Sequence, residues 1–320
     1  MSRSLEARID GVRRAEKADL AWALSLVEDR RSGRAPELGA LLGALPMRLE
    51  SHRVGLTGPP GVGKSTLAAA MARAFRSAGK TVGVLAVDPS SPRSGGALLG
   101  DRVRMALDHT DPGLFVRSFA TGGEAGGLMH AIDAAARVLG AAFDRVLIET
   151  TGVGQTETDI VYLADTVVLV IQPGSGDVLQ FLKAGIMEVP DIVVVNKVDQ
   201  GRLAEAAAAD LRSALGATPR DLEHEWKVTV LRTSARDGTG IEELVDEVER
   251  HRSATHGGLM KRRRRGAVAW TLSLVTRRYG VYGIERLGGR RAAESLAEQF
   301  LDEGASPNEV ALRLGERITG

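Results

Sequence analysis

The sequence lacks cysteine altogether, and it has no long apolar run. Without cysteine, disulfide bonds and thiolate metal sites are excluded, and the absence fits a reducing compartment. No apolar stretch approaches the roughly 18 residues that span a bilayer. The first 20 residues carry acidic side chains and have no apolar region of the kind found in signal peptides. We therefore expect a cytoplasmic protein without membrane association.

An excess of charge of one sign is also missing. The 320 residues include 42 Lys and Arg and 41 Asp and Glu, which leaves a net charge of +1. This balance gives no sign of a nucleic-acid binder or a polybasic membrane protein. Hydrophobic residues make up 43% of the chain, enough for a sizeable core in one large domain or in one domain with helical extensions.

Short apolar runs alternate with helical patterns between residues 52 and 253. The residues of these runs are apolar throughout and do not alternate with polar ones, and helices separate the runs. This pattern predicts a parallel sheet covered on both faces. The fold class is therefore α/β, with a doubly wound, mostly parallel sheet. The predicted strands are 54–57, 81–87, 115–119, 145–149, 166–171, 192–196 and 227–231. The predicted helices are 64–77, 127–139, 157–164, 178–187, 203–215 and 241–252.

Both ends of the chain are predicted to be helical. Residues 1–50 show apolar residues at helical spacing, interrupted at 31–36, and form an N-terminal extension. Residues 254–320 contain five consecutive basic residues at 261–265 and a break at Gly288 and Gly289. The predicted organisation is thus an extension at 1–50, an α/β domain at 51–253 and a helical region at 254–320.

A phosphate-binding loop follows the first predicted strand and opens the first helix of the domain. It matches the pattern G-x-x-x-x-G-K-[ST], and its residues are Gly58, Pro59, Pro60, Gly61, Val62, Gly63, Lys64, Ser65 and Thr66. Glycines let backbone N–H groups converge on phosphate oxygens, and the helix N-terminus adds partial positive charge. We expect Lys64 to reach the β- and γ-phosphates of a nucleotide and Ser65 to bind Mg²⁺.

A guanine-reading tetrad ends the predicted strand 192–196. In it, Asn196 and Lys197 precede Asp199, whose carboxylate can accept hydrogen bonds from guanine N1–H and the exocyclic amine. Adenine offers no such pair of donors. Ser234 and Ala235 follow the next strand, where GTPases place a loop that supports the base. The tetrad predicts GTP and GDP as ligands.

Carboxylates at strand ends are the candidates for a magnesium shell. Glu149 ends the strand 145–149, and Gly152 just beyond it could offer its N–H to the γ-phosphate. Asp88 ends the second strand and Asp101 lies further on; either could join the shell directly or through water. Asp88 could instead be a turn residue before Pro89, and Asp101 a helix N-cap.

The hydrolytic residues are less clearly marked. Lys64 and Glu149 are the catalytic candidates from the motifs, but Val153 stands directly after Gly152, where many GTPases have glutamine. Gln155 is the candidate to orient the attacking water; it could equally be a solvated loop residue. We therefore hypothesise slow intrinsic hydrolysis that a partner accelerates.

Together these segments resemble the MeaB/ArgK family of metallochaperone-type GTPases over nearly the whole chain. The resemblance rests on residues 58–66, 87–91, 99–105, 149–157 and 196–199, and most specifically on 176–188. It implies a homodimer, joined by the C-terminal helices, that gates adenosylcobalamin delivery to an acyl-CoA mutase and protects that mutase. The typical partner is methylmalonyl-CoA mutase.

The resemblance also implies that 174–188 is a third switch, with Gln180 and Lys183 as candidates for coupling to the mutase. Both could instead be solvated residues of an ordinary amphipathic helix. Pro190 and the bulky pair Phe181 and Leu182 depart from the family pattern. These departures could indicate a mutase that acts on another acyl-CoA.

Three alternative functions remain open. A nickel-insertion GTPase would need clustered soft or imidazole ligands, whereas the histidines are isolated, and isolated histidines are expected at surface or capping positions. They are His52, His109, His130, His224, His251 and His256. A P-loop kinase would need an acceptor site, and the guanine tetrad opposes it. A nucleic-acid-binding GTPase is supported only by the basic run 261–265, so no nucleic-acid partner is expected.

Overall fold

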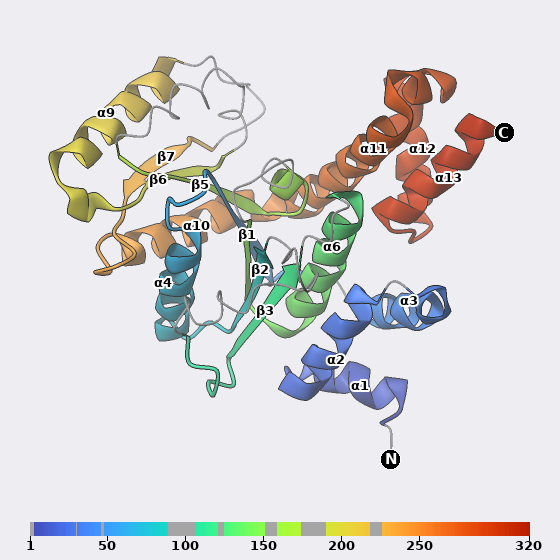
Figure 1. Cartoon of the computed structure of the whole chain (residues 1–320), viewed down its shortest axis with the longest axis horizontal. Coiled ribbons are helices and arrows are strands. Elements are labelled where there is room, and N and C mark those ends of the chain that lie inside the picture. The colour runs from blue at the N-terminus through green and yellow to red at the C-terminus, as the bar shows by residue number, and fades with distance from the viewer. Residues whose placement is uncertain are drawn as a thin grey trace, which may run out of the picture. The chain divides into compact units, whose positions relative to one another are not determined.

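The computed structural model describes residues 3–29, 31–45, 48–88, 107–120, 125–150, 159–173, 190–217 and 226–320. The chain consists of two compact units, Met1–Gly257 and Gly258–Gly320. The first unit contains the sheet with the helices around it, and the second contains three helices (Figure 1).

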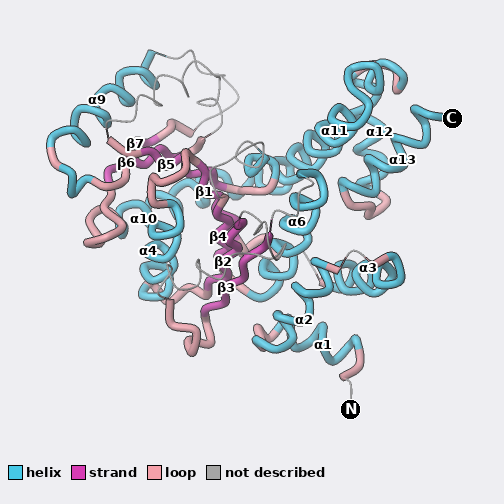
Figure 2. Tube along the Cα trace, viewed as in Figure 1, coloured by secondary structure: helices cyan, strands magenta, loops and turns pink. Residues whose placement is uncertain are grey.

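Within the described residues, seven parallel strands form one sheet in the order β3-β2-β4-β1-β5-β6-β7 (Figure 2). The strands are β1 (His52–Thr57), β2 (Val82–Asp88), β3 (Leu114–Ala120), β4 (Arg145–Glu149), β5 (Thr166–Ile171), β6 (Ile192–Val195) and β7 (Thr229–Arg232). This confirms the predicted parallel α/β sheet, and the predicted strand bounds differ by at most a few residues. The strand order reverses around β1, so β4 and β5 lie on either side of it.

Helices cover both faces of the sheet because the strand side chains alternate between two apolar clusters. Val168 and Val170 pack in one cluster with α4 (Lys64–Ser77) and α10 (Ile241–Thr255). Leu169 and Ile171 pack in another cluster with α9 (Arg202–Ala217). The helix α6 (Ala125–Ala142) packs on the strands β1 to β4. Both faces of the central strands are therefore buried.

The helix predicted at 157–164 is confirmed only in part, because within the described residues the α-helical conformation ends at Asp159. Residues Ile160–Tyr162 form only a short 3-10 helix, η2. A Cβ added to Gly55 of β1 would lie 2.5 Å from Ile160 Cγ1 and 2.9 Å from Ala164 Cβ. Ile160 and Ala164 thus pack directly on the bare backbone of β1. The β-branched Ile160 and Val161 also have little preference for a longer α-helix.

The N-terminal residues form helices that pack against α6. These are α1 (Leu5–Arg13), α2 (Lys17–Glu28), the 3-10 helix η1 (Ser32–Arg34) and α3 (Ala35–Ala44). The predicted interruption at 31–36 is present between α2 and α3, but Pro36 lies inside the first turn of α3. Proline is tolerated there because the first N–H groups of a helix have no partner within it.

The second unit is a small helical domain of α11 (Leu259–Arg286), α12 (Arg290–Asp302) and α13 (Pro307–Thr319). Its apolar core includes Val268, Leu272, Val310 and Leu314. The predicted break is confirmed, since Gly288 and Gly289 have φ angles of 90° and 91° between α11 and α12. Among the described residues, no helix combines the length and the apolar character that crossing a bilayer requires.

Candidate functional site

The phosphate-loop sequence forms a tight turn between β1 and α4. The turn depends on glycine at Gly58, where φ is 137° and an added Cβ would lie 2.0 Å from the carbonyl oxygen of Val170. Gly63 has φ of 94° and directly precedes α4, and a Cβ there would lie 2.8 Å from Asn196 Nδ2. Other residues would be strained at these angles and would collide with the neighbouring strand or side chain.

Lys64, the first residue of α4, points back into this turn and is only 5% exposed. Its Nζ donates hydrogen bonds to the carbonyl oxygens of Gly58 at 2.6 Å and Pro59 at 2.9 Å. A buried ammonium group therefore lies beside the N-terminus of a helix. Both features favour a bound anion at this place.

Ser65 and Glu149 come together although 84 residues separate them. Ser65 Oγ donates a hydrogen bond to Glu149 Oε1 at 2.7 Å. Glu149 ends β4, where its partner in the parallel ladder is Leu56 of β1. The hydroxyl and the buried carboxylate are hard oxygen donors of the kind that Mg²⁺ prefers.

Asn196 joins the tetrad to the phosphate loop. Its Nδ2 donates a hydrogen bond to the carbonyl oxygen of Val62 at 2.9 Å. Its Oδ1 accepts hydrogen bonds from Thr233 Oγ1 at 3.1 Å and from the Ala235 amide at 3.2 Å. The side chain is 2% exposed, and its donor and acceptor are satisfied by protein atoms from two segments, the phosphate loop and the loop after β7.

The other tetrad residues also contact neighbouring segments. Lys197 Nζ donates hydrogen bonds to the carbonyl oxygen of Gly61 and to Gln172 Oε1, both at 2.7 Å. Asp199 Oδ1 accepts a hydrogen bond from Ser234 Oγ at 3.0 Å. The tetrad is thus tied both to the phosphate loop and to the loop after β7.

All these residues lie at one edge of the sheet, because parallel strands end on the same side. The structure brings together Lys64, Ser65, Glu149, Asn196, Lys197, Asp199, Ser234 and Ala235. Sequence reasoning overlooked Gln172 and gave Thr233 no role of its own. A polar residue directly after a fully buried strand is the signal that would have indicated Gln172.

Several candidates lie outside the described residues: Asp101, Gly152, Gln155, Gln180 and Lys183. Asp88 is the last residue of β2, paired with Ala120 of β3, but its side chain is not among those described.

The expectation that isolated histidines occupy surface or capping positions is wrong for His52 and His251. Both are fully buried at the opposite, amino-terminal edge of the sheet. Thr166 Oγ1 lies 2.7 Å from His52 Nε2 and 2.6 Å from His251 Nδ1, and His251 Nε2 lies 3.2 Å from Asp191 Oδ1. Burial lowers the pKa of His52 to about 3. Both imidazole rings can lie in the interior because each forms a hydrogen bond with the Thr166 hydroxyl.

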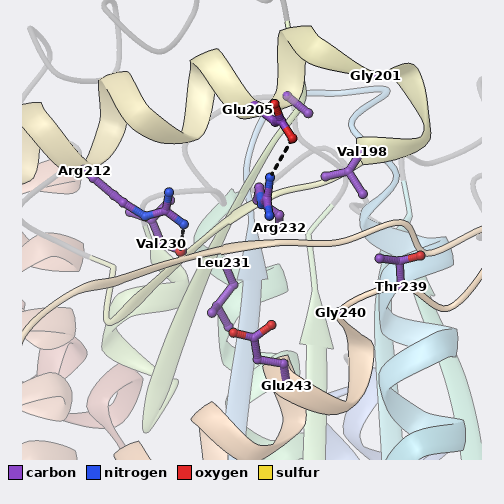
Figure 3. A pocket seen from close by; sticks show the side chains of 11 residues that line it. Val198, Gly201, Glu205, Arg212, Val230, Leu231, Arg232, Thr239, Gly240 and Glu243 are labelled. Carbon is purple, nitrogen blue, oxygen red and sulfur yellow. Dashed lines mark hydrogen bonds and ion pairs between the residues drawn. The ribbon is translucent and has the colours of Figure 1, made fainter.

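A cavity of about 560 Å³ lies between α9, the edge strand β7 and the start of α10 (Figure 3). Val198 from the tetrad lines it, but none of the described phosphate-loop residues does. Arg212 donates a hydrogen bond to the carbonyl oxygen of Val230 at 3.1 Å on this side of the sheet. The cavity is therefore a separate hollow on the outer side of β7, distinct from the phosphate loop.

The parallel sheet and the phosphate loop define a P-loop NTPase. The chain belongs to the family described as Methylmalonyl Co-A mutase-associated GTPase MeaB, whose sequence profile matches residues 20–281. The resemblance found in the sequence is thereby confirmed. As a member, the protein is a GTPase, an enzyme that binds guanine nucleotides and hydrolyses GTP.

Individual relatives agree with this assignment. A protein of Pyrococcus abyssi named as a putative GTPase is 43% identical in an alignment of 324 positions. The alignment covers 99% of this chain and 97% of the relative. GTPase ArgK of Escherichia coli is 36% identical, covering 83% and 82%. The methylmalonic aciduria type A homolog, mitochondrial, of Mus musculus is 36% identical, covering 83% and 68%. A solved LAO/AO transport system kinase matches with a TM-score of 0.69 at 27% identity, over all of both chains.

Proposed function

We propose that this GTPase gates adenosylcobalamin delivery to an adenosylcobalamin-dependent acyl-CoA mutase, and protects that mutase, while GTP and GDP bind at the carboxyl edge of the sheet. The observation that carries the nucleotide part is the 2.9 Å hydrogen bond from Asn196 to the Val62 carbonyl. It fixes the distance between a tetrad suited to guanine and a loop suited to phosphates. We propose that one nucleotide bridges both.

In this proposal each segment holds one part of the nucleotide. The backbone amides of residues 58–66 and the Lys64 ammonium bind the phosphates. Asp199 accepts the two guanine hydrogen bonds, while Ser234 orients its carboxylate and the Ala235 backbone supports the base. Gly152 is the proposed donor to the γ-phosphate, and Gln155, or a partner in its place, orients the attacking water.

Ser65 and Glu149 fit a magnesium ion, because a hydroxyl and a buried carboxylate lie 2.7 Å apart beside the loop. Asp88 and Asp101 are proposed to complete its shell, directly or through water. Bound Mg²⁺ would neutralise charge on the β- and γ-phosphates. Lys64 contributes by holding the phosphates in place as that charge moves during hydrolysis.

The mutase part rests on resemblance. The family is described as associated with methylmalonyl-CoA mutase, and the mouse relative carries the name of methylmalonic aciduria type A. Gln180 and Lys183 are proposed to couple the nucleotide state to the mutase. Methylmalonyl-CoA mutase is the first candidate partner, and a related acyl-CoA mutase is the alternative that the sequence departures suggest.

The second unit is proposed to hold two copies of the chain together. It exposes large apolar side chains, with 69% of Val281, 64% of Tyr282 and 57% of Leu312 accessible. In the proposed dimer these side chains would be buried between the two copies. Light scattering of the purified protein tests the proposed dimer, and a monomeric mass at micromolar concentration would contradict it.

A change of base specificity tests the nucleotide part. In Asp199→Asn, the amide oxygen can still accept from N1–H, but the NH2 group replaces the acceptor that the guanine 2-amino group needs and can instead donate to the 2-carbonyl of xanthine. We expect GTP affinity to fall by about a hundredfold or more and xanthosine triphosphate to be preferred. A variant that keeps wild-type GTP affinity would overturn the role of Asp199.

Retention of a purified acyl-CoA mutase tests the partner. The mutase should bind the immobilised GTPase with an affinity that differs between GDP and a non-hydrolysable GTP analogue. If methylmalonyl-CoA mutase is retained equally in both nucleotide states, or is not retained, the result would point to another acyl-CoA mutase. Failure with every such mutase would refute the proposal.

Two further experiments test the alternative functions. Transfer of labelled γ-phosphate to anything but water would favour a kinase. Tight stoichiometric nickel binding would favour nickel insertion.

A further inference from the structure

Gln172 is the first residue after β5, a strand that lies between β1 and β6 in the sheet. Its Oε1 accepts a hydrogen bond from Lys197 Nζ at 2.7 Å. The same ammonium donates to the carbonyl oxygen of Gly61 at 2.7 Å. One cation thus joins three segments: the phosphate loop after β1, the end of β5 and the tetrad after β6.

The backbone of Lys197 is held in an unusual conformation. Its φ of 64° and ψ of 42° are left-handed, and among the described residues only Ala15 shares a positive φ without being glycine. Such a conformation persists only where its surroundings fix it. The amide of Val198 donates to the Thr233 carbonyl at 3.1 Å and anchors the backbone. Gln172 and Gly61 anchor the far end of the side chain.

We infer that Gln172 is a positioning residue for guanine-nucleotide binding, acting through Lys197; this rests on the proposed nucleotide site. A lysine side chain has four rotatable bonds and samples many rotamers when it is free. With two acceptors at fixed places, Lys197 holds the phosphate loop at Gly61 before nucleotide arrives. Nucleotide binding then loses less conformational entropy, because the loop and the tetrad are already ordered.

The choice of glutamine fits this role. The side chain offers a carbonyl oxygen that accepts a hydrogen bond from the Lys197 ammonium. Lys64 has acceptors of its own, because its ammonium donates to the carbonyl oxygens of Gly58 and Pro59. Asn196 ties the loop at Val62. Gly61 and Val62 are therefore held by two different tetrad side chains.

The test compares Gln172→Met, which keeps the length but removes the acceptor, with Gln172→Glu, which keeps an acceptor. We expect Gln172→Met to weaken binding of fluorescently labelled GDP by roughly five- to tenfold, mainly through faster dissociation. KM for GTP should rise by a similar factor, with a much smaller change in kcat. Gln172→Glu should stay within about twofold of wild type. Thermal unfolding without nucleotide should be similar for all variants.

A double-mutant cycle with Lys197→Met separates this role from a general structural one. If Gln172 acts through Lys197, Gln172→Met adds no further loss in the Lys197→Met background. Independent, multiplying losses would overturn the inference, and so would wild-type GDP dissociation in Gln172→Met. A wild-type chain that binds no guanine nucleotide would instead refute the proposed site itself.

Discussion

Asn196 Nδ2 lies 2.9 Å from the carbonyl oxygen of Val62, although 134 residues separate them in the chain. The hydrogen bond connects the end of β6 with the turn after β1, across the intervening strand β5. Because both groups are buried, neither can exchange this bond for one with water without a large cost. In the proposed nucleotide site, this hydrogen bond would link recognition of the base to recognition of the phosphates.

Removal of the Asn196 side chain should uncouple the guanine tetrad from the phosphate loop. In Asn196→Ala, the buried Val62 carbonyl, the Thr233 hydroxyl and the Ala235 amide lose their partner, which costs about 1–3 kcal/mol of unfolding free energy. GDP affinity should fall about tenfold or more, as measured by fluorescence titration. Asn196→Asp keeps the acceptor but not the donor, so it should bind no better than Asn196→Ala. Wild-type affinity in the aspartate variant would show that the link to Val62 is dispensable.

Two glycines of the phosphate loop should differ in their tolerance of alanine. A Cβ at Gly58 would lie 2.0 Å from the Val170 carbonyl oxygen, whereas Gly61 has nothing within 4 Å. We expect Gly58→Ala to lose about 3 kcal/mol or more of stability, measured by urea unfolding. Gly61→Ala, the matched control, should lose only about 1 kcal/mol from its positive φ. Equal losses would mean that the contact with β5 does not restrict the loop.

Ser65→Ala should separate magnesium binding from phosphate binding. The variant loses the hydroxyl that lies 2.7 Å from Glu149 but keeps the loop backbone and Lys64. GDP affinity in the presence of Mg²⁺ should fall by about tenfold, while affinity in EDTA should stay unchanged. Ser77→Ala, at the exposed end of the same helix, is the control and should behave as wild type. A Mg²⁺ dependence that survives in Ser65→Ala would exclude Ser65 as a ligand.

Acid should destabilise the protein through His52. Burial lowers the pKa of His52 from 6.5 to about 3, so between these values the unfolded chain binds a proton that the folded chain does not. Stability is therefore lost as pH falls below 6.5, by about 1.4 kcal/mol per pH unit, or about 2 kcal/mol at pH 5. Urea unfolding at pH 7 and pH 5 measures the difference.

In His52→Gln this contribution to the pH dependence should disappear, whatever the variant's absolute stability. His109→Gln, which alters an exposed histidine, serves as the control and should keep the wild-type slope. If His52→Gln retains that slope too, His52 is not the group that titrates.

The sequence indicated the parts of the site because they depend on local patterns. Apolar runs without polar alternation predicted parallel strands, and the glycines around Lys64 predicted the turn that now lies between β1 and α4. The tetrad and Ser234 were recognised from their places after strands. Each of these features requires only a short stretch of chain with a definite chemistry.

Only the tertiary structure decided which parts meet. Strand order arises from pairing between distant segments, so no local pattern showed that β4 and β5 lie on either side of β1. That order places Glu149 against Ser65 and brings Gln172 to Lys197. It also buries His52 and His251 around Thr166, where isolated histidines were expected at the surface. The sequence by itself determined the chemical groups and the class of nucleotide, while long-range packing determined their neighbours, because a side chain's partners depend on contacts that sequence spacing does not encode.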